Sequence, residues 1–354
     1  MNRYHRTGAS VSQTFKSTLM AAVMALVLLA CGDDEPAVTA NRAGDVTTTV
    51  AREGSKTVPE GRGVITGNAD GSRTVKSAYG TAVVPAEPKR IVSVLGYIDF
   101  ETMLALGVTP VGAGTQGGTA ASGFAPHLAG RTEGIQALAW ADGAPVEAIA
   151  ALRPDLIFAP DEDSAKLVGA IAPTVPAGAA EGREWKDDFR YIADVLGHGD
   201  DADRLLKDYE AKAKALRGRL RAAVADRTVA SAQVAFDHSQ VLVDHKGAFS
   251  SAVLSELGLT LAPVVTGATK VPITLSFEQL PGLDADIVFW QVRQRDEDGS
   301  RDVAGFQAAK DSPLWSRVRA VEAGTVFEVD NRPWYFPTIL AAAHMLDDIE
   351  KALL

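Results

Sequence analysis

The sequence predicts an α/β protein with two Rossmann-like lobes joined by one long helix. The first observation is a pattern of Glu, apolar residues, Leu, Asp and an apolar run, which begins at Glu147 and again 131 residues later at Glu278. The second is an alternation of short apolar runs and helical segments in both halves of the chain. The third is a continuous helical pattern over residues 200–225. A duplicated unit indicates two similar lobes with a cleft between them, and small ligands bind in such clefts.

The first 31 residues are typical of a secretion signal rather than of a folded element. Basic residues precede an apolar run over residues 19–30, which is too short to span a bilayer. The boundary Leu28-Leu29-Ala30-Cys31 resembles a bacterial lipobox, in which the cysteine is lipidated and becomes the new N-terminus. Cys31 is the only cysteine, so the chain can form neither an internal disulfide nor a cysteine-based metal site. We therefore expect a lipid anchor at Cys31 as the protein's sole attachment to a membrane.

The composition after residue 31 argues against nucleic-acid binding. This part carries 32 Lys and Arg against 45 Asp and Glu, a net charge of −13, whereas nucleic acid rewards basic surfaces. Residues 32–72 are rich in Thr, Ala, Gly and Asp with little apolar periodicity, and are predicted to form a flexible tether. No later segment is apolar over 18 residues, so none is expected to span a membrane.

Residues 73–199 are predicted to form the first lobe. Strands that alternate with helices indicate a parallel sheet covered on both faces. The predicted strands are stretches of 74–84, 91–95, a strand starting at Val108, and 155–158; the predicted helices are one through 103–106 that Gly107 stops, 165–171 and 185–196.

The predicted helix over residues 200–225 is long enough to bridge two lobes. Acidic residues at its start favour the positive end of the helix dipole, and basic residues follow toward its C-terminus. An intermittent apolar stripe runs along it, and 26 residues would span about 39 Å. We expect such a helix to be rigid and to limit how far the lobes swing.

Residues 226–354 are predicted to form the second lobe. The segment Leu254-x-x-Leu257-Gly258-Leu259 echoes Met103-x-x-Leu106-Gly107-Val108 of the first lobe, a second and weaker sign of duplication. The predicted strands are 231–236, 240–243, 286–290 and 325–329, and the predicted helices are 249–257 and 338–353.

A family resemblance is carried by the stretches Pro88 to Ser93, Leu104 to Gly112, Glu147 to Ile157, Ile171 to Val175, Leu257 to Leu259, Glu278 to Leu280, Ala285 to Phe289 and Ser312 to Trp315. Together they cover about residues 74–354, and their order and spacing are more specific than any one of them. They resemble the substrate-binding lipoproteins of ABC importers for ferric siderophores, haem and vitamin B12.

The resemblance implies capture and delivery of a ligand, without catalysis. The fold would be that of a class III periplasmic binding protein, with the ligand in the cleft between the lobes. The chain would work as a monomer outside the cytoplasm, and would hand a ferric siderophore, with no cofactor, to an ABC permease driven by a separate cytoplasmic ATPase. In this family one Glu from each lobe pairs with arginines of the permease, and Glu147 and Glu278 occupy those positions. The alternative is that both merely complement helix dipoles.

Ligands of open α/β sheets bind beyond the carboxyl ends of the strands, so the turns after strands are candidate contact sites. Four of the five Trp residues fall at such turns, together with Tyr, Arg and His residues. Aromatic rings offer stiff apolar contact, and Arg offers forked hydrogen bonds to the oxygens of a chelate. The candidates are Tyr97, Trp140, Arg183, Trp185, His238, Trp290, Arg293, Arg295, Arg332, Trp334 and Tyr335, while Trp315 is assigned to the core.

Direct metal binding is disfavoured, because no histidines have close ligand spacing, although His238 and His245 could meet across a hairpin. Haem remains an alternative ligand with Tyr97, Tyr335 or His238 as axial ligand, and cobalamin is another. Two other classes of protein are alternatives. An envelope hydrolase lacks support, because the Gly-x-Ser-x-Gly and His-Glu-x-x-His motifs are absent. A ligand-sensing or scaffolding surface lipoprotein would share the fold but have no permease.

Overall fold

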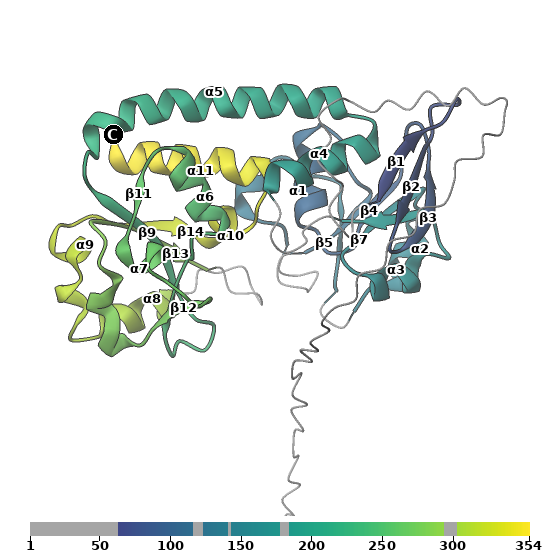
Figure 1. Ribbon diagram of the computed structural model, residues 1–354. Helices are drawn as coiled ribbons and strands as arrows, with labels where there is room; N and C mark the ends of the chain where they lie inside the picture. Colours follow the sequence, from purple (N-terminus) through teal and green to yellow (C-terminus); the bar gives the residue numbers. More distant parts are fainter. Residues whose placement is uncertain (1–62, 116–122, 141–142, 178–183, 294–302) are drawn as a thin grey trace, which may run out of the picture. The chain divides into compact units, whose positions relative to one another are not determined.

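The computed structural model describes residues 63–115, 123–140, 143–177, 184–293 and 303–354, which all belong to one compact unit (Figure 1). The predicted signal, Cys31, Arg183 and Arg295 lie outside the described residues. The predicted tether extends too far. Strand β1 (Val64–Gly67) lies inside it, and pairs with β2 (Arg73–Ser77), which pairs with β3 (Gly80–Val84), in an antiparallel sheet. The folded part therefore begins before residue 73.

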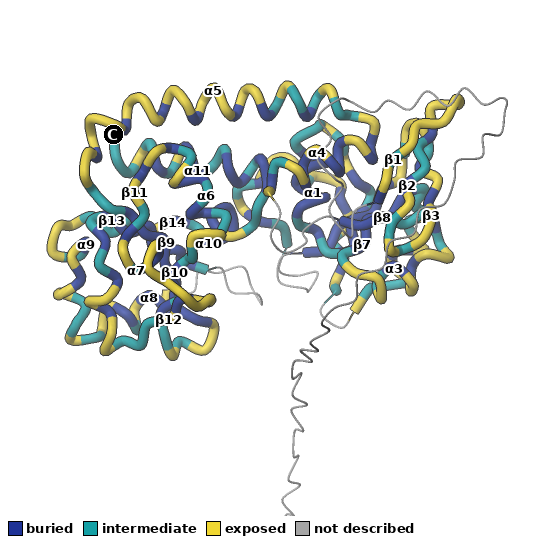
Figure 2. Tube along the Cα trace, in the orientation of Figure 1, coloured by how far each residue is buried: buried dark blue, intermediate teal, exposed yellow. Residues whose placement is uncertain are grey.

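The first lobe is built on a five-stranded parallel sheet in the order β6-β5-β4-β7-β8, as the strand–helix alternation predicts. Its central strands are buried on both faces, dark blue in Figure 2, because helices cover a parallel sheet from two sides. The elements are β4 (Ile91–Ser93), α1 (Ile98–Ala105), β5 (Gly112–Gly114), η2 (Pro126–Leu128), β6 (Gln136–Leu138), α2 (Val146–Ala151), β7 (Leu156–Ala159), α3 (Glu162–Val168), β8 (Thr174–Pro176) and α4 (Trp185–Leu196).

The second lobe contains a six-stranded mixed sheet, where the alternation alone suggested a parallel one. Strands β11, β9, β13 and β14 run parallel, but β10 and β12 are antiparallel to their neighbours. The chain turns back directly after β9, with Ala235 N–H donating to the Gln240 carbonyl, and so short a turn can join only antiparallel strands. The elements are β9 (Thr228–Val234), β10 (Val241–Val243), α6 (Phe249–Glu256), β11 (Thr260–Leu261), α7 (Pro263–Thr266), β12 (Ile273–Leu275), η3 (Phe277–Leu283), β13 (Ile287–Val292), α8 (Val303–Lys310), η4 (Trp315–Arg317), α9 (Arg319–Glu322), β14 (Val326–Asp330), α10 (Asn331–Tyr335) and α11 (Ile339–Leu353).

The repeated Asp of the two sequence copies has the same role in both lobes. Asp155, just before β7, accepts hydrogen bonds from the backbone amides of the two residues that precede β4 (2.7 and 2.9 Å). Asp286, just before β13, accepts from the backbone amide and the hydroxyl of Thr228 at the start of β9 (both 2.8 Å). These bonds, aided by Arg319, hold the pKa of Asp286 down at about 2. Each Asp therefore ties the start of its strand to the neighbouring parallel strand.

The weaker repeat, which contains Gly107 and Gly258, also has the same structure in both lobes. Helices α1 and α6 both end at a glycine with positive φ, Gly107 (75°) and Gly258 (74°). In each case the next amide bonds back to the carbonyl five residues earlier, Val108 to Met103 and Leu259 to Leu254 (2.8 and 3.1 Å). This arrangement closes a helix and favours glycine, which has no Cβ to clash in the left-handed conformation. Helices α1 and α6 thus end in the same way.

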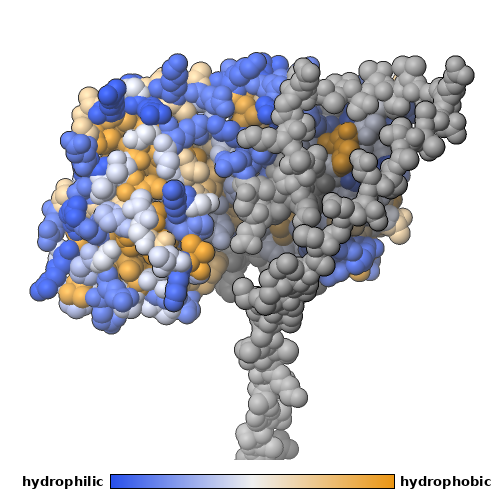
Figure 3. Space-filling view, viewed as in Figure 1, coloured by the Kyte–Doolittle hydropathy of each residue, from blue (hydrophilic) through white to orange (hydrophobic). Residues whose placement is uncertain are grey.

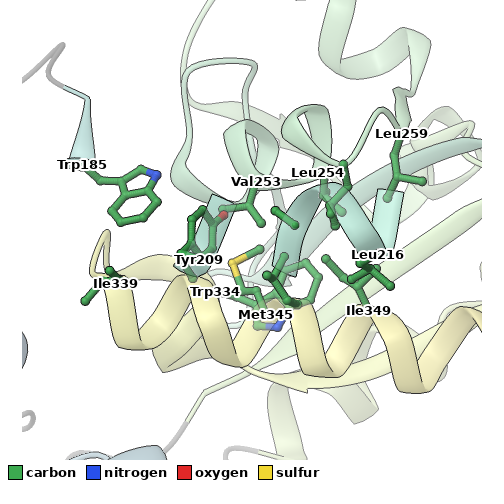
Figure 4. Close-up of a cluster of buried hydrophobic side chains, with 14 of the residues drawn as sticks. Trp185, Tyr209, Leu216, Val253, Leu254, Leu259, Trp334, Ile339, Met345 and Ile349 are labelled. Atoms are coloured by element: carbon green, nitrogen blue, oxygen red, sulfur yellow. The ribbon is translucent and has the colours of Figure 1, made fainter. Parts of the chain in front are cut away.

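The long helix α5 (Gly199–Ala223) matches the predicted bridge to within two residues. It packs beside α4 and α11 in one buried cluster that also receives side chains from α6 and α10 (Figure 4). Trp185 of α4 meets Tyr209 of α5 and Phe249 of α6 edge-on, with ring centroids 5.2 and 6.0 Å apart. Helix α5 therefore does not bridge the lobes alone, because helices from both lobes are buried against it.

The outer face of α5 is charged and mostly hydrophilic, along the top of Figure 3. Lys212 pairs with Asp347 of α11 (2.5 Å), and Arg219 pairs with Glu350. None of the helices in the described residues is long and apolar enough to cross a bilayer.

Candidate ligand site

Aromatic side chains from both lobes gather where the strands end. Tyr97, which follows β4, stacks on Phe336, which follows α10, with centroids 4.4 Å apart. Trp140, which follows β6, meets Tyr97 edge-on at 6.1 Å and donates its indole N–H to the Thr115 carbonyl (2.6 Å). Tyr335, 56% exposed, lies edge-on to Phe336 at 5.2 Å. We call Tyr97, Trp140, Tyr335 and Phe336 the aromatic cluster.

Backbone geometry at the end of β4 explains the place of Tyr97. Gly96 has φ of 77°, and a Cβ built there would lie 1.8 Å from the carbonyl oxygen of Gly114. Only glycine permits this close approach of the two strand ends. The turn then leads directly into α1, with Tyr97 as the residue before its first turn.

Two predicted arginines of the second lobe lie against aromatic rings. Arg332 in α10 is buried, with its guanidinium carbon 5.8 Å from the ring centroid of Phe336. Arg293, directly after β13, rests its guanidinium on the ring of Phe236 at 3.7 Å. Phe236 follows β9 and is 77% exposed. Since β9, β13 and β14 run parallel, their carboxyl ends meet at one edge, as the sequence predicts.

A buried polar contact joins the lobes next to the aromatic cluster. Glu101 of α1 faces His127 at 3.2 Å and accepts a hydrogen bond from the hydroxyl of Thr338, the N-cap of α11. Both Glu101 and Thr338 are 1% exposed. In the same helix α1, burial raises the pKa of Asp99 to about 7, opposed by a hydrogen bond from Ser93.

Three of the predicted ligand-facing tryptophans lie in hydrophobic cores instead. Trp290 is 1% exposed and packs against Phe306 and Trp315. Trp334 is fully buried and donates its indole N–H to Asp348 (2.9 Å). Trp185 is 5% exposed in the cluster around α5. Their rings have almost no surface to offer a ligand. By contrast Trp315, which was assigned to the core, does pack there.

His238 lies half-buried in the turn between β9 and β10, with a positive φ of 56°. The register pairs Val243 with Ala232, so His245 lies past the far end of β10 from that turn. The two histidines therefore do not meet across the hairpin. Within the described residues, no three His, Asp or Glu side chains gather closely enough to hold a metal ion.

Sequence reasoning missed Phe336 and Phe236. Phe236 had a signal, because it is an aromatic residue two positions after β9, at the same strand edge as the other candidates. Phe336 had a weaker one, because the short helix α10 separates it from the end of β14.

Glu147 and Glu278 are both exposed, and each is the second residue of its helix. Glu278 lies in the 3₁₀ helix η3, which begins with a capping box of Ser276 and Gln279. Hydrogen bonding to Ser276 lowers the pKa of Glu278 below its usual value. The two glutamates thus occupy equivalent positions in the two lobes.

A concave surface elsewhere in the first lobe is lined by residues before β4 and after α4, among them Glu87, Lys89 and His198. It lies at the amino end of β4, away from the aromatic cluster, and Glu87 and Lys89 pair with each other there. We place the ligand site at the aromatic cluster, because ligands of such sheets bind at the carboxyl ends of strands.

Two α/β lobes bridged by a long helix, with aromatic and arginine side chains at the strand ends, define a bilobal binding protein. The profile of the family described as periplasmic binding protein matches residues 92–333. The chain belongs to this family, and its fold is the predicted one.

Relatives of known name support the same fold and class. The chain is 31% identical to "Probable siderophore-binding lipoprotein YfiY" of Bacillus subtilis over 80% of this chain and 88% of that protein. It is 27% identical to the iron(3+)-hydroxamate-binding protein FhuD of the same organism over 79% and 86%. Among solved structures, Staphylococcus aureus SirA complexed with staphyloferrin B matches with a TM-score of 0.64 and 24% identity, over 79% of this chain and 98% of that one.

Proposed function

We propose that this protein captures a ferric siderophore outside the cytoplasm and delivers it to an ABC permease, without catalysing a reaction. The observation that carries the proposal is the aromatic cluster, which combines Tyr97 and Trp140 of the first lobe with Tyr335 and Phe336 of the second. Arg332 lies beside Phe336 of this cluster, and Arg293 lies on Phe236 at the strand edge of the second lobe. A ligand bound there would contact residues of both lobes.

The chemistry of these side chains suits an iron chelate. A siderophore wraps the metal in its own oxygens, so the protein needs to touch the chelate rather than the iron. Aromatic faces supply broad contact, and guanidinium groups donate to chelate oxygens. The curated relatives named for siderophore, hydroxamate or ferric citrate binding support this ligand class.

Delivery would depend on Glu147 and Glu278, one exposed carboxylate in each lobe. We propose that both pair with arginines of the permease, which works with a cytoplasmic ATPase. Two charged contacts far apart in the sequence would steer docking and fix its orientation. A lipid on Cys31 would hold the monomeric protein at the membrane surface, and so keep the loaded form near its permease.

Tryptophan-fluorescence titration of residues 32–354 with ferric hydroxamates, ferric citrate, ferric catecholates, haem and cobalamin tests the proposal. Trp140 lies in the aromatic cluster, so a ligand there should quench its emission. A Trp140→Phe variant serves as the control, because it should bind with less quenching. Saturation by a ferric siderophore at submicromolar concentration is expected.

Other outcomes would redirect the assignment. Saturation by haem or cobalamin alone would replace the siderophore with that ligand. Binding of none by a folded protein would contradict the proposal and favour a sensing or scaffolding lipoprotein.

A further inference from the structure

A continuous network of buried polar side chains lies beneath the strand ends of the second lobe. Gln291 of β13 donates its amide to Asp244 (2.6 Å) and Ser231 (2.7 Å). Asn331 of α10 donates to the side-chain oxygens of Gln291 (2.6 Å) and Gln233 (3.1 Å). Gln233 of β9 then accepts from Arg293 Nε (2.9 Å). We call Asp244, Gln291, Asn331, Gln233 and Arg293 the polar network.

The three side-chain amides of this network are too buried to exchange partners with solvent. Gln291 is 2% exposed, Gln233 3% and Asn331 7%. A buried amide that loses its partner costs about 1–3 kcal/mol, so the sequence keeps such groups only where every one is satisfied. Polar residues in the centre of an otherwise apolar sheet therefore call for a specific reason.

Asp244 sets the orientation of the side-chain amides in the network. Asp244 Oδ2 accepts from the Ser250 hydroxyl and from the Gln291 NH₂, so the Gln291 oxygen faces Asn331. Asn331 must then present its NH₂ to both glutamine oxygens. The oxygen of Gln233 is thereby aimed at Arg293 rather than its NH₂. The amide orientations follow from one another through four residues.

Arg293 is held at two places as a result. Its Nε is bonded to Gln233, and its guanidinium plane lies on Phe236 at 3.7 Å. An arginine side chain has several rotatable bonds, and fixing them before a ligand arrives reduces the entropy lost on binding. We propose that Gln233 is a positioning residue, whose oxygen, oriented by Asn331 and Gln291, holds Arg293 for an anionic oxygen of the bound chelate. This inference rests on the proposed function, and it adds a residue that does not itself touch the ligand.

A double-mutant cycle tests it. The four proteins are the wild type, Gln233→Met, Arg293→Ala and the double variant, and the probes are a ferric trihydroxamate and ferric citrate. Gln233→Met keeps the length of the side chain and removes the acceptor. We expect it to weaken binding about tenfold, which corresponds to about 1.4 kcal/mol and is close to the lower end of the range for a hydrogen bond to a charged group. In the Arg293→Ala background the same change should have no effect on affinity.

Gln233→Glu is the conservative control, because it keeps an acceptor at the same place. It should bind within about threefold of the wild type, a difference below 1 kcal/mol. Thermal unfolding of each variant separates lost affinity from lost fold. Should Gln233→Met not fold, Asn331→Ala takes its place in the cycle, since it leaves Gln233 present but without its anchor.

Two results would overturn the inference. One is wild-type affinity in Gln233→Met, and the other is an equal loss with and without Arg293, which would mean that Gln233 acts on its own. A wild-type protein that binds neither probe nor any other ferric siderophore would instead refute the proposed function itself, and the inference with it.

Discussion

At the scale of single residues, Phe336 connects the two lobes of the candidate site. Its ring stacks on Tyr97 of the first lobe at 4.4 Å and neighbours Tyr335 and Arg332 of the second. It is half-buried, so one part of the ring supports Tyr97 while another remains available. Removal of this ring would therefore affect contacts in both lobes.

We expect Phe336→Ala to weaken siderophore binding by about 5- to 30-fold, equivalent to about 1–2 kcal/mol of lost aromatic contact. Phe277→Ala is a matched control, because Phe277 is also half-buried but lies in η3, packed on the core of the second lobe. Fluorescence titration measures both. Equal affinities of the two variants would contradict the role given to Phe336.

Asp99 predicts a pH dependence of stability. Burial raises its pKa to about 7 from 3.8, so the folded protein binds the proton more tightly than the unfolded chain does. The free energy of unfolding should therefore fall as pH rises from about 4 to 7, by an amount on the order of 4 kcal/mol, and level off above. Asp99→Asn should remove this part of the slope. Urea unfolding of both proteins at several pH values checks it, and an unchanged slope in the variant would refute it.

At the scale of elements, helix α11 is attached at its start to the first lobe. Its N-cap Thr338 accepts from the amide of Ala341 (3.0 Å) and donates to Glu101 of α1, which also faces His127. The last helix of the chain thus joins α1, although more than 200 residues separate them. The contact is buried, so removing either partner leaves the other polar group without a hydrogen-bond partner, and no water replaces it.

Glu101→Ala should lower the free energy of unfolding by about 3 kcal/mol, because it leaves His127 and the Thr338 hydroxyl buried without their partner. Glu350→Ala removes a carboxylate from the same helix α11, where it pairs with Arg219 at the surface. That change should cost less than about 1 kcal/mol. Chemical denaturation measures both, and similar losses would show that the buried contact has no special weight.

The limits of prediction are clearest in the elements that carry the tryptophans. The apolar run at 286–290 correctly predicts a buried strand, but Trp290 belongs to this strand and not to the turn after it. In β13 successive side chains alternate between two cores, so Ile287 and Phe289 face one and Val288 and Trp290 the other. Two more residues, Gln291 and Val292, are buried in the strand before Arg293 leaves the core. Strand ends set by pairing partners are not visible in a single sequence.

Helix α10 misled the prediction in a different way. Residues 331–335 follow the last strand and were interpreted as a turn, but Asp330 caps them into one helical turn. Trp334 then points into the core while Tyr335, its neighbour, is exposed. The sequence correctly predicts that each repeated Glu lies at the start of a helix and each repeated Asp at the start of a strand. Both positions depend on local sequence signals.

At the scale of the whole chain, the bridge between the lobes is a helical layer rather than α5 alone. Trp185 and Phe189 of α4, Leu216 of α5, and Met345 and Ile349 of α11 share one buried cluster. Lys186 of α4 also pairs with Glu256 of α6 (2.8 Å). Close-packed interiors resist deformation, so we expect small rather than large movements of the lobes when a ligand binds.

If the lobes move little, delivery must depend on surfaces that the permease can recognise, and the equivalent glutamates are our candidates for them. Glu147→Ala with Glu278→Ala should abolish most iron uptake in cells while leaving siderophore affinity unchanged, because neither residue belongs to the aromatic cluster. Glu133→Ala with Glu322→Ala is the matched control, since it removes one other exposed glutamate from each lobe.

Each single docking variant should retain partial uptake, because one charged contact would still orient the protein. Uptake of labelled ferric siderophore, measured beside fluorescence titration of the purified variants, separates docking from capture. Equal uptake by the docking and control variants would mean that the two glutamates only complement the dipoles of their helices. Lost uptake with lost affinity would place them in ligand binding. Only lost uptake with intact affinity supports a protein that presents one carboxylate from each lobe to its permease.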